Sequence, residues 1–129
     1  MPKYILNGKL DIEPLITTRD FLARALQEAQ SELEIAGTIQ AFEICYELAW
    51  KTCKKIISLR GIDYHTPKEV FRVAALDGLI PDAERWFNYV DKRNITTHEY
   101  EQNILAAVYP ILPKFLKDLD LLIRNLKKL

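Results

Sequence analysis

The sequence has few of the residues from which the commonest catalytic sites are built. It contains two cysteines and two histidines, no glycine-rich phosphate loop and no paired-cysteine metal motif. A zinc site based on histidine would have to recruit carboxylates, so neither a metal nor a cofactor is expected. Ser31 and Ser58 have no histidine near them in sequence, which disfavours a serine-nucleophile triad.

An excess of charge and a long apolar run are also missing. The 18 basic and 18 acidic side chains cancel, so a site for a polyanion would have to be a local cluster. No apolar run is long enough to cross a bilayer, and the N-terminus lacks a basic segment followed by an apolar one. These absences predict a cytoplasmic protein with no membrane partner.

The two cysteines are not expected to form a disulfide. Cys45 and Cys53 are eight residues apart in a predicted helix, which separates them by roughly 12 Å along the axis. Both are expected to pack as small apolar residues in a reducing compartment.

Strand signals are nearly absent, and the first half of the chain has the apolar spacing of two long helices. The first is predicted from about Asp11 to Leu33, and Gly37 and Thr38 are predicted to interrupt the chain after it. A second stripe then stops at Arg60-Gly61, where glycine suits the end of a helix. Its members are Phe42, Cys45, Tyr46, Ala49, Trp50, Cys53, Ile56 and Ile57.

The second half predicts three further helices. Thr66-Pro67-Lys68-Glu69 has the pattern of a helix start, so a short helix should run from Pro67 to about Asp77. Asp82 can cap a fourth helix, and a fifth long helix should follow Tyr100 with a kink near Pro110. With 49% hydrophobic residues, residues 1–129 should form one domain: an all-α, up-and-down four-helix bundle with an additional short helix.

Two groups of side chains, the first of them on the second helix, can be interpreted in more than one way. Glu43, Glu47 and Lys51 are four residues apart and share a face, as in a solvated ladder of ion pairs. Alternatively, one glutamate turns toward the polar end of the bundle and holds a cation such as Arg93. A second group of aromatic residues fits a core or a subunit interface, and it comprises Tyr46, Trp50, Trp86, Phe87 and Tyr89.

The stretch D-K-R-N-I-T-T-H-E-Y, residues 91–100, has residue types suited to phosphate chemistry. Arg93 offers a planar fork of donors that is always charged, and His98 can exchange a proton near neutral pH. On a continuous helix Asn94 and His98 share a face, whereas Arg93 and His98 point about 140° apart. Their convergence needs a long reach by Arg93, a helix that ends near Thr97, or a second subunit. Composition alone favours a capped helix end.

The pattern R-N-I-T-T-H-E-Y resembles the signature of the HEPN superfamily. Together with F-E-I-C-Y-E-L-A-W-K, it is similar to the branch of nucleotidyltransferase substrate-binding proteins, and the resemblance covers nearly the whole chain. It implies a HEPN-like helical bundle that forms a twofold homodimer or a higher oligomer. It also implies a separately encoded partner, a minimal nucleotidyltransferase (MNT).

The resemblance further implies a toxin–antitoxin pair in which the HEPN protein is a metal-independent endoribonuclease. Arg93 and His98 take the catalytic positions, Asn94 and Glu47 support them, and Tyr100 is the residue to which the nucleotidyltransferase attaches AMP. RNA is then a further partner. Two alternatives remain: a non-catalytic partner that binds the nucleotide or target of the nucleotidyltransferase, and an unrelated helical scaffold with a chance motif.

Overall fold

The computed structural model describes the backbone of residues 4–98 and 101–129, and the side chains of these residues except 98, 101 and 102. A short hairpin of β1 (Tyr4–Ile5) and β2 (Leu10–Asp11) precedes the helices. The helices are α1 (Glu13–Glu28), α2 (Glu32–Leu59), α3 (Pro67–Leu76), α4 (Ala83–His98), α5 (Glu101–Val108) and α6 (Leu112–Leu126), with a 3-10 segment, η1 (Tyr109–Ile111), between the last two.

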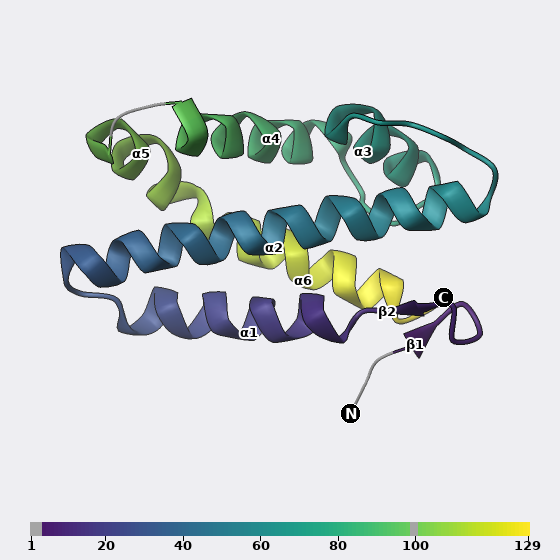
Figure 1. Ribbon diagram of the computed structural model, residues 1–129, viewed down its shortest axis with the longest axis horizontal. Coiled ribbons are helices and arrows are strands. Elements are labelled where there is room, and N and C mark those ends of the chain that lie inside the picture. The colour runs from purple at the N-terminus through teal and green to yellow at the C-terminus, as the bar shows by residue number, and fades with distance from the viewer. Residues whose placement is uncertain (1–3, 99–100) are drawn as a thin grey trace.

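The long helices run alternately up and down the molecule (Figure 1). α1 and α4 lie on either side of α2, the longest helix, and α6 crosses behind α2 in this view. The short α3 turns the chain back between α2 and α4. The predicted four-helix bundle with an additional short helix is therefore confirmed, with α5 and α6 together as its fourth long member.

The boundary between the first two helices was predicted wrongly. The break lies at residues 29–31, and Gly37 and Thr38 are inside α2. Ser31 and Glu34 form a capping box, in which the Ser31 hydroxyl accepts from the Glu34 N–H at 3.1 Å and the Glu34 carboxylate accepts from the Ser31 N–H at 3.0 Å. These bonds satisfy N–H groups that a helix start leaves unpaired, so α2 begins before Gly37.

The N-terminal hairpin was not predicted either. Tyr4 pairs with Asp11 and Ile5 with Leu10 in antiparallel register. Leu6, Asn7 and Gly8 make the turn with φ values of 55°, 58° and 81°. Positive φ is unusual for leucine, and strands of two residues are too short to show alternation, so the sequence gives little sign of this hairpin.

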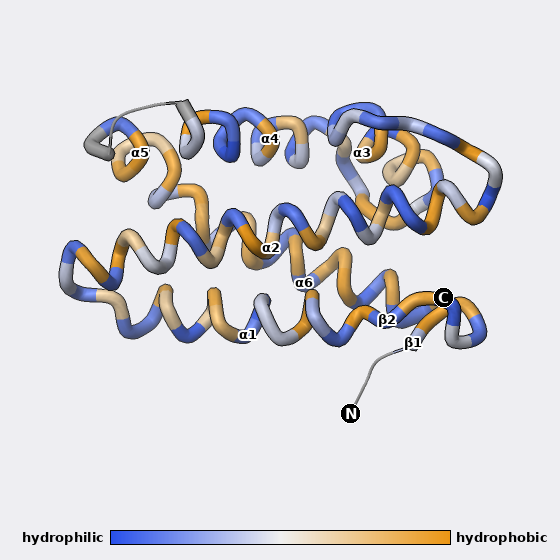
Figure 2. The backbone as a smooth tube through the Cα atoms, in the orientation of Figure 1, coloured by the Kyte–Doolittle hydropathy of each residue, from blue (hydrophilic) through white to orange (hydrophobic). Residues whose placement is uncertain are grey.

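Apolar stripes on the helices meet in one core, which Figure 2 shows as orange segments along each helix. Its centre is a set of aromatic rings whose neighbouring centroids are 4.8 to 5.7 Å apart, and it comprises Phe42, Phe71, Trp86, Tyr89 and Phe115. Such offset and edge-to-face pairs are favoured beyond their burial. Of the predicted aromatic set, Tyr46, Trp86 and Tyr89 are buried, and Trp50 and Phe87 pack against the core from its edge.

A buried polar contact ties α4 to α6 inside this core. The Tyr89 hydroxyl donates to Asp118 Oδ2, and Arg85 Nε lies 3.4 Å from the same oxygen. Asp118 is only 7% exposed, so both partners are needed to offset the cost of removing its charge from water. This contact fixes which side of α4 faces the core.

The kink predicted near Pro110 is a break between two helices. Pro110 lies in η1, where α5 ends and α6 begins at a new angle (Figure 1). Proline lacks the N–H that a continuous helix would use, and its ring clashes with the preceding turn. No helix in the described part of the chain combines the length and the apolar character that spanning a bilayer requires.

Candidate functional site

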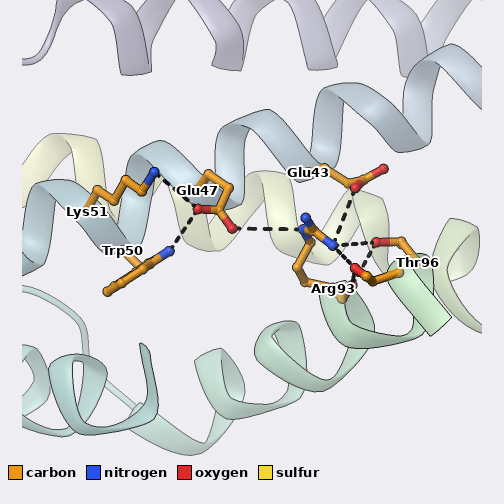
Figure 3. A network of polar contacts seen from close by, with 7 residues as sticks. Glu43, Glu47, Trp50, Lys51, Arg93 and Thr96 are labelled. Atoms are coloured by element: carbon orange, nitrogen blue, oxygen red, sulfur yellow. Dashed lines mark hydrogen bonds and ion pairs between the residues drawn. The ribbon is translucent and has the colours of Figure 1, made fainter. Parts of the chain in front are cut away.

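The C-terminal half of α4 carries the polar motif, and the packing of the helix determines where it points. Asp82 Oδ1 accepts a hydrogen bond from the Glu84 N–H at 2.9 Å near the start of the helix. Tyr89 and Val90 are buried, and Arg93 follows them at four and three residues, so it continues the inward side of α4. Arg93 therefore extends from α4 toward α2 (Figure 3).

Two carboxylates of α2 meet the Arg93 guanidinium. Its Nη1 lies 3.5 Å from Glu43 Oε2, and its Nε lies 3.9 Å from Glu47 Oε1. At that distance the second contact is Coulombic, and Nε has no hydrogen-bond acceptor among the described residues. The alternative in which a glutamate of α2 holds Arg93 is thus confirmed, and Glu43 shares this contact with Glu47.

Arg93 is also tied to its own helix. Nη1 donates to Thr96 Oγ1 at 3.2 Å and to Thr97 Oγ1, which are three and four residues further along α4. The Thr96 hydroxyl donates in turn to the Arg93 carbonyl oxygen at 2.7 Å. These bonds direct the guanidinium toward the C-terminal end of α4, where the helix reaches residue 98.

Glu47 connects Arg93 to the rest of α2. Its Oε2 accepts a hydrogen bond from Trp50 Nε1 at 3.2 Å and lies 3.6 Å from Lys51 Nζ (Figure 3). Two carboxylates, one guanidinium and one ammonium therefore make a network with no net charge. The ladder of ion pairs and the contact with Arg93 both occur, because Glu47 uses one oxygen for each.

An open groove of about 650 Å³ lies beside this network, and it is lined by Gln40, Glu43, Ile44, Glu47, Leu48 and Arg93. Ile44 is 45% exposed and gives the groove an apolar side next to these charges. A phosphate in this groove would meet the donors of Arg93 and also the repulsion of two carboxylates. Binding there requires Arg93 to exchange a carboxylate for the phosphate.

The two cysteines of α2 do not supply a nucleophile. Burial raises the pKa of the Cys45 thiol to about 11 and that of Cys53 to about 12. Both are free and buried, as predicted, and their raised pKa values keep the thiols protonated near neutral pH. The described residues also hold no group of three or more side chains suited to a metal ion.

Comparison with known proteins identifies the family. A family model described as "Nucleotidyltransferase substrate binding protein like" matches residues 12–128. The chain belongs to this family. The resemblance inferred from the two motifs is therefore confirmed, and the bundle is HEPN-like.

Relatives of this substrate-binding-like family agree with that assignment. The chain is 38% identical over 99 aligned positions to the "Probable ribonuclease HepT" of Haemophilus influenzae, and the match covers 73% of this chain and 68% of that protein. A Haemophilus influenzae structure described as the fold of a substrate-binding domain of a nucleotidyltransferase superimposes with a TM-score of 0.75 at 31% identity, covering 88% of this chain and 96% of that one. A crystal structure from Thermus thermophilus gives a TM-score of 0.78 at 27% identity, covering 87% and 98%.

The structure brings together some of the residues predicted for the HEPN site. Arg93 and Glu47 meet in the groove, and Asn94 is exposed on α4. α4 remains helical through His98, so Asn94 and His98 share a face and the helix does not end at Thr97. Positions 93 and 98 are five residues apart on this continuous helix, which corresponds to about 140° around its axis. Tyr100 lies outside the described residues.

Other contributors were missed from the sequence. Glu43 was one of the two glutamates considered as a holder of Arg93 but was not placed among the site residues, and the motif threonines were given no role. Thr96 and Thr97 follow Arg93 by three and four residues, the spacing at which helical side chains touch, so this signal was available. Burial and the neighbouring Glu47 raise the pKa of Tyr46, which keeps that phenol neutral behind the network.

Proposed function

We propose that this protein is the HEPN partner of a minimal nucleotidyltransferase and acts as a metal-independent endoribonuclease. The observation that carries the proposal is the Arg93 network, in which a guanidinium held by Thr96 and Glu43 lies beside an open groove. The family description and the ribonuclease name of a relative support it. Arg93 and His98 take the catalytic roles.

The reaction needs little from the protein, because RNA carries its own nucleophile. The 2′-hydroxyl oxygen bonds to the adjacent phosphorus as the bond from phosphorus to the 5′-oxygen breaks. One proton leaves the hydroxyl and one reaches the departing oxygen, and His98 serves one of these transfers as base or acid. Arg93 binds the phosphoryl oxygens as negative charge develops on them. Glu47, supported by Trp50 and Lys51, orients the guanidinium between turnovers.

A twofold dimer would complete the site. Positions 93 and 98 are about 140° apart around the axis of one helix, so a second copy across a symmetry axis can place its His98 opposite Arg93 of the first. Two copies would also supply two histidines for the two proton transfers. The groove that holds Arg93 is the surface proposed to face the axis.

AMP attached to Tyr100 is the proposed control. Tyr100 follows His98 by two residues, so an attached nucleotide would add bulk and negative charge next to the catalytic groups. The same modification would explain why the protein has a nucleotidyltransferase as its partner. In this proposal the pair forms a toxin–antitoxin system.

A second candidate function is a non-catalytic partner of the nucleotidyltransferase. The observation that favours it is the charge balance of the groove, where Glu43 and Glu47 already compensate Arg93. A site of this kind suits a ligand with both donors and acceptors, such as a nucleotide base, better than a bare phosphate.

RNA cleavage in the presence of EDTA separates the two candidates. We expect the wild type to release products with a 2′,3′-cyclic phosphate, and Arg93→Ala and His98→Ala each to lower the rate by about 10²-fold or more. The matched control is Arg24→Ala, which changes an arginine of α1 outside the groove and should cleave as the wild type does. Circular dichroism should show the same helix content in the wild type and all three variants.

Two other results would contradict the catalytic roles proposed for this protein. A purified wild type that cuts no RNA, yet binds the nucleotidyltransferase and alters its activity, would replace the ribonuclease by the non-catalytic partner. Loss of helix content in His98→Ala would instead assign that histidine a structural role.

A further inference from the structure

We propose that the exposed side of α6 binds the phosphate backbone of a nucleic acid. This surface, the α6 basic face, consists of Lys114, Lys117, Arg124, Lys127 and Lys128. The proposal goes beyond the function proposed above, because binding to α6 requires neither cleavage nor the Arg93 groove.

The exposed charged side chains of α6 and of the turn that follows it are all basic. The two acidic residues of α6 do not weaken this face. Asp118 is buried against Tyr89, and Asp120 accepts hydrogen bonds from Arg19 Nε at 2.5 Å and Nη2 at 3.0 Å. None of the five basic side chains forms an ion pair with a described residue, so their charges are available to a ligand.

The five side chains lie on one side of the helix. At about 100° per residue they fall within an arc of roughly 140°, opposite the buried side that includes Phe115, Leu119 and Leu122. From Lys114 to Lys128 the face is about 21 Å long at about 1.5 Å per residue. Arg124 and Lys127 also border a hollow of about 370 Å³ between α1 and α6, whose other charged lining is Arg19 with its two carboxylate partners, Asp20 and Asp120.

The charge of the whole chain makes this face distinctive. Because basic and acidic residues are equal in number, five uncompensated cations on one helix leave the rest of the chain with a matching net negative charge. The field is therefore local, and a polyanion would be attracted to the α6 basic face more strongly than to the rest of the surface.

Composition favours nucleic acid over the other anionic partners. Four of the five residues are lysines, which are depleted in protein–protein interfaces and common at phosphate backbones. The apolar side of α6 is buried in the core and is not available for insertion into a bilayer, as a membrane-binding amphipathic helix requires. A flexible row of ammonium groups suits a chain of phosphates, whose charges repeat along its length.

Fluorescence anisotropy with labelled oligonucleotides tests the proposal on the full chain. The α6 variant is Lys117→Gln/Arg124→Gln/Lys128→Gln. The matched control is Lys9→Gln/Arg24→Gln/Lys55→Gln, which removes the same charge from the hairpin turn, α1 and α2, at residues that likewise form no ion pair with a described residue. RNA and DNA strands of about 20 nucleotides distinguish the two sources of the backbone.

We expect the wild type to bind the RNA strand at about 50 mM salt, and the α6 variant to bind it about tenfold or more weakly. The dependence of log affinity on log salt should also become shallower by about 2, since each phosphate contact on a single strand contributes about 0.7. In the control variant, both the loss of RNA affinity and the decrease in salt dependence should be less than half of those in the α6 variant. Equal loss in both variants, no wild-type binding to either strand, or binding only to vesicles of phosphatidylcholine and phosphatidylserine would overturn the proposal.

The Arg93→Ala variant keeps this result separate from the ribonuclease proposal. Arg93→Ala should abolish cleavage but make the salt dependence of RNA binding shallower by no more than about 0.7, the share of one phosphate contact, because α6 is intact. If the wild type binds RNA through α6 and cuts none, the α6 proposal stands and the ribonuclease fails. If it cuts RNA and the α6 variant binds as tightly as the wild type, the reverse holds.

Discussion

Arg93 is the residue on which both proposed functions depend, and its charge is already matched by two carboxylates. The three side chains are 25 to 37% exposed, and the ion-pair distances are 3.5 and 3.9 Å. Partly exposed pairs of this kind contribute only about 0 to 1 kcal/mol, whereas a phosphate can accept two charge-assisted bonds from one guanidinium. Glu43 and Glu47 should therefore lower the affinity for phosphate without preventing its binding.

The role proposed for Tyr100 is tested by labelling. Incubation with the cognate nucleotidyltransferase and ATP should add the mass of AMP to the wild type and leave Tyr100→Phe unchanged, because only the phenol oxygen can accept the group. Intact-protein mass spectrometry measures this directly, with Tyr64→Phe as a control that keeps Tyr100 and should label fully. Equal labelling of wild type and Tyr100→Phe would mean that another residue is the acceptor.

Tyr89 is expected to matter for stability. Burial, and then its bond to Asp118, raise the pKa of its hydroxyl, which remains a neutral donor at ordinary pH. Tyr89→Phe leaves the Asp118 carboxylate with Arg85 as its remaining described partner, at a cost of about 1 to 3 kcal/mol, or roughly 3 to 5 °C in Tm per kcal/mol. Thermal unfolding followed by circular dichroism measures the change.

The control for this substitution is Tyr64→Phe, a 38% exposed tyrosine between α2 and α3. It should change Tm by less than about 1 °C, as surface substitutions usually do. If the two variants were equally stable, the buried contact between α4 and α6 would contribute nothing measurable.

At the scale of helices, the position of Gly37 inside α2 gives a prediction of opposite sign. Its φ is not positive, and a Cβ added there would meet no atom within 4 Å. Gly37→Ala should raise the free energy of unfolding by about 0.5 to 1 kcal/mol, because alanine is the better helix former. Chemical denaturation with an unchanged m value measures the gain.

Gly61 provides the contrast, since its φ is 83°. Alanine there is strained whatever the available space, so Gly61→Ala should destabilise the protein. A loss of stability in Gly37→Ala would mean that α2 is interrupted at that residue, as the sequence first suggested.

The helices could be predicted from sequence more completely than their ends. The stripe through Leu26, Ala29 and Leu33 has helical spacing on both sides of the break, so periodicity alone runs across it. The capping pair Ser31 and Glu34 was readable, but a local signal of this kind competes with glycine at residue 37 for the same boundary. Tertiary contacts decide between them: Thr38 is fully buried, which requires α2 to be formed there.

For the candidate site, the participating residues could be predicted from the sequence, but the way in which they meet could not. The spacing of Glu43 and Glu47 placed them on one face, and the motif marked Arg93, so the participants were readable. Their meeting depends on the rotation of α4 about its axis, which Tyr89, Asp118 and the aromatic core determine. Such long-range packing is not encoded in any local pattern.

For the whole molecule, the exposed Ile44 beside Arg93 is the test of the proposed dimer. Ile44→Glu would bring a third carboxylate next to Glu43 and Glu47 in a shared interface, and should raise the dissociation constant of the dimer about tenfold or more. Size-exclusion chromatography with light scattering, over a range of concentrations, measures it.

Leu76→Glu is the matched control, because Leu76 is 83% exposed at the end of α3, outside the groove. It should leave the dissociation constant unchanged. A wild type that is monomeric at every concentration, or equal weakening by both substitutions, would contradict a dimer formed through this groove.

The break at Pro110 separates α5 from α6, and the two helices are packed against the core to different extents. α6 buries seven residues against the core, whereas Val108 alone is buried among residues 103–108 of α5. Amide hydrogens of α5 should thus exchange with solvent through local opening, while those of α6 exchange only through global unfolding. A nucleotide or a partner that acts on α5 would reorder one turn or two of helix, and the rest of the molecule would keep its shape.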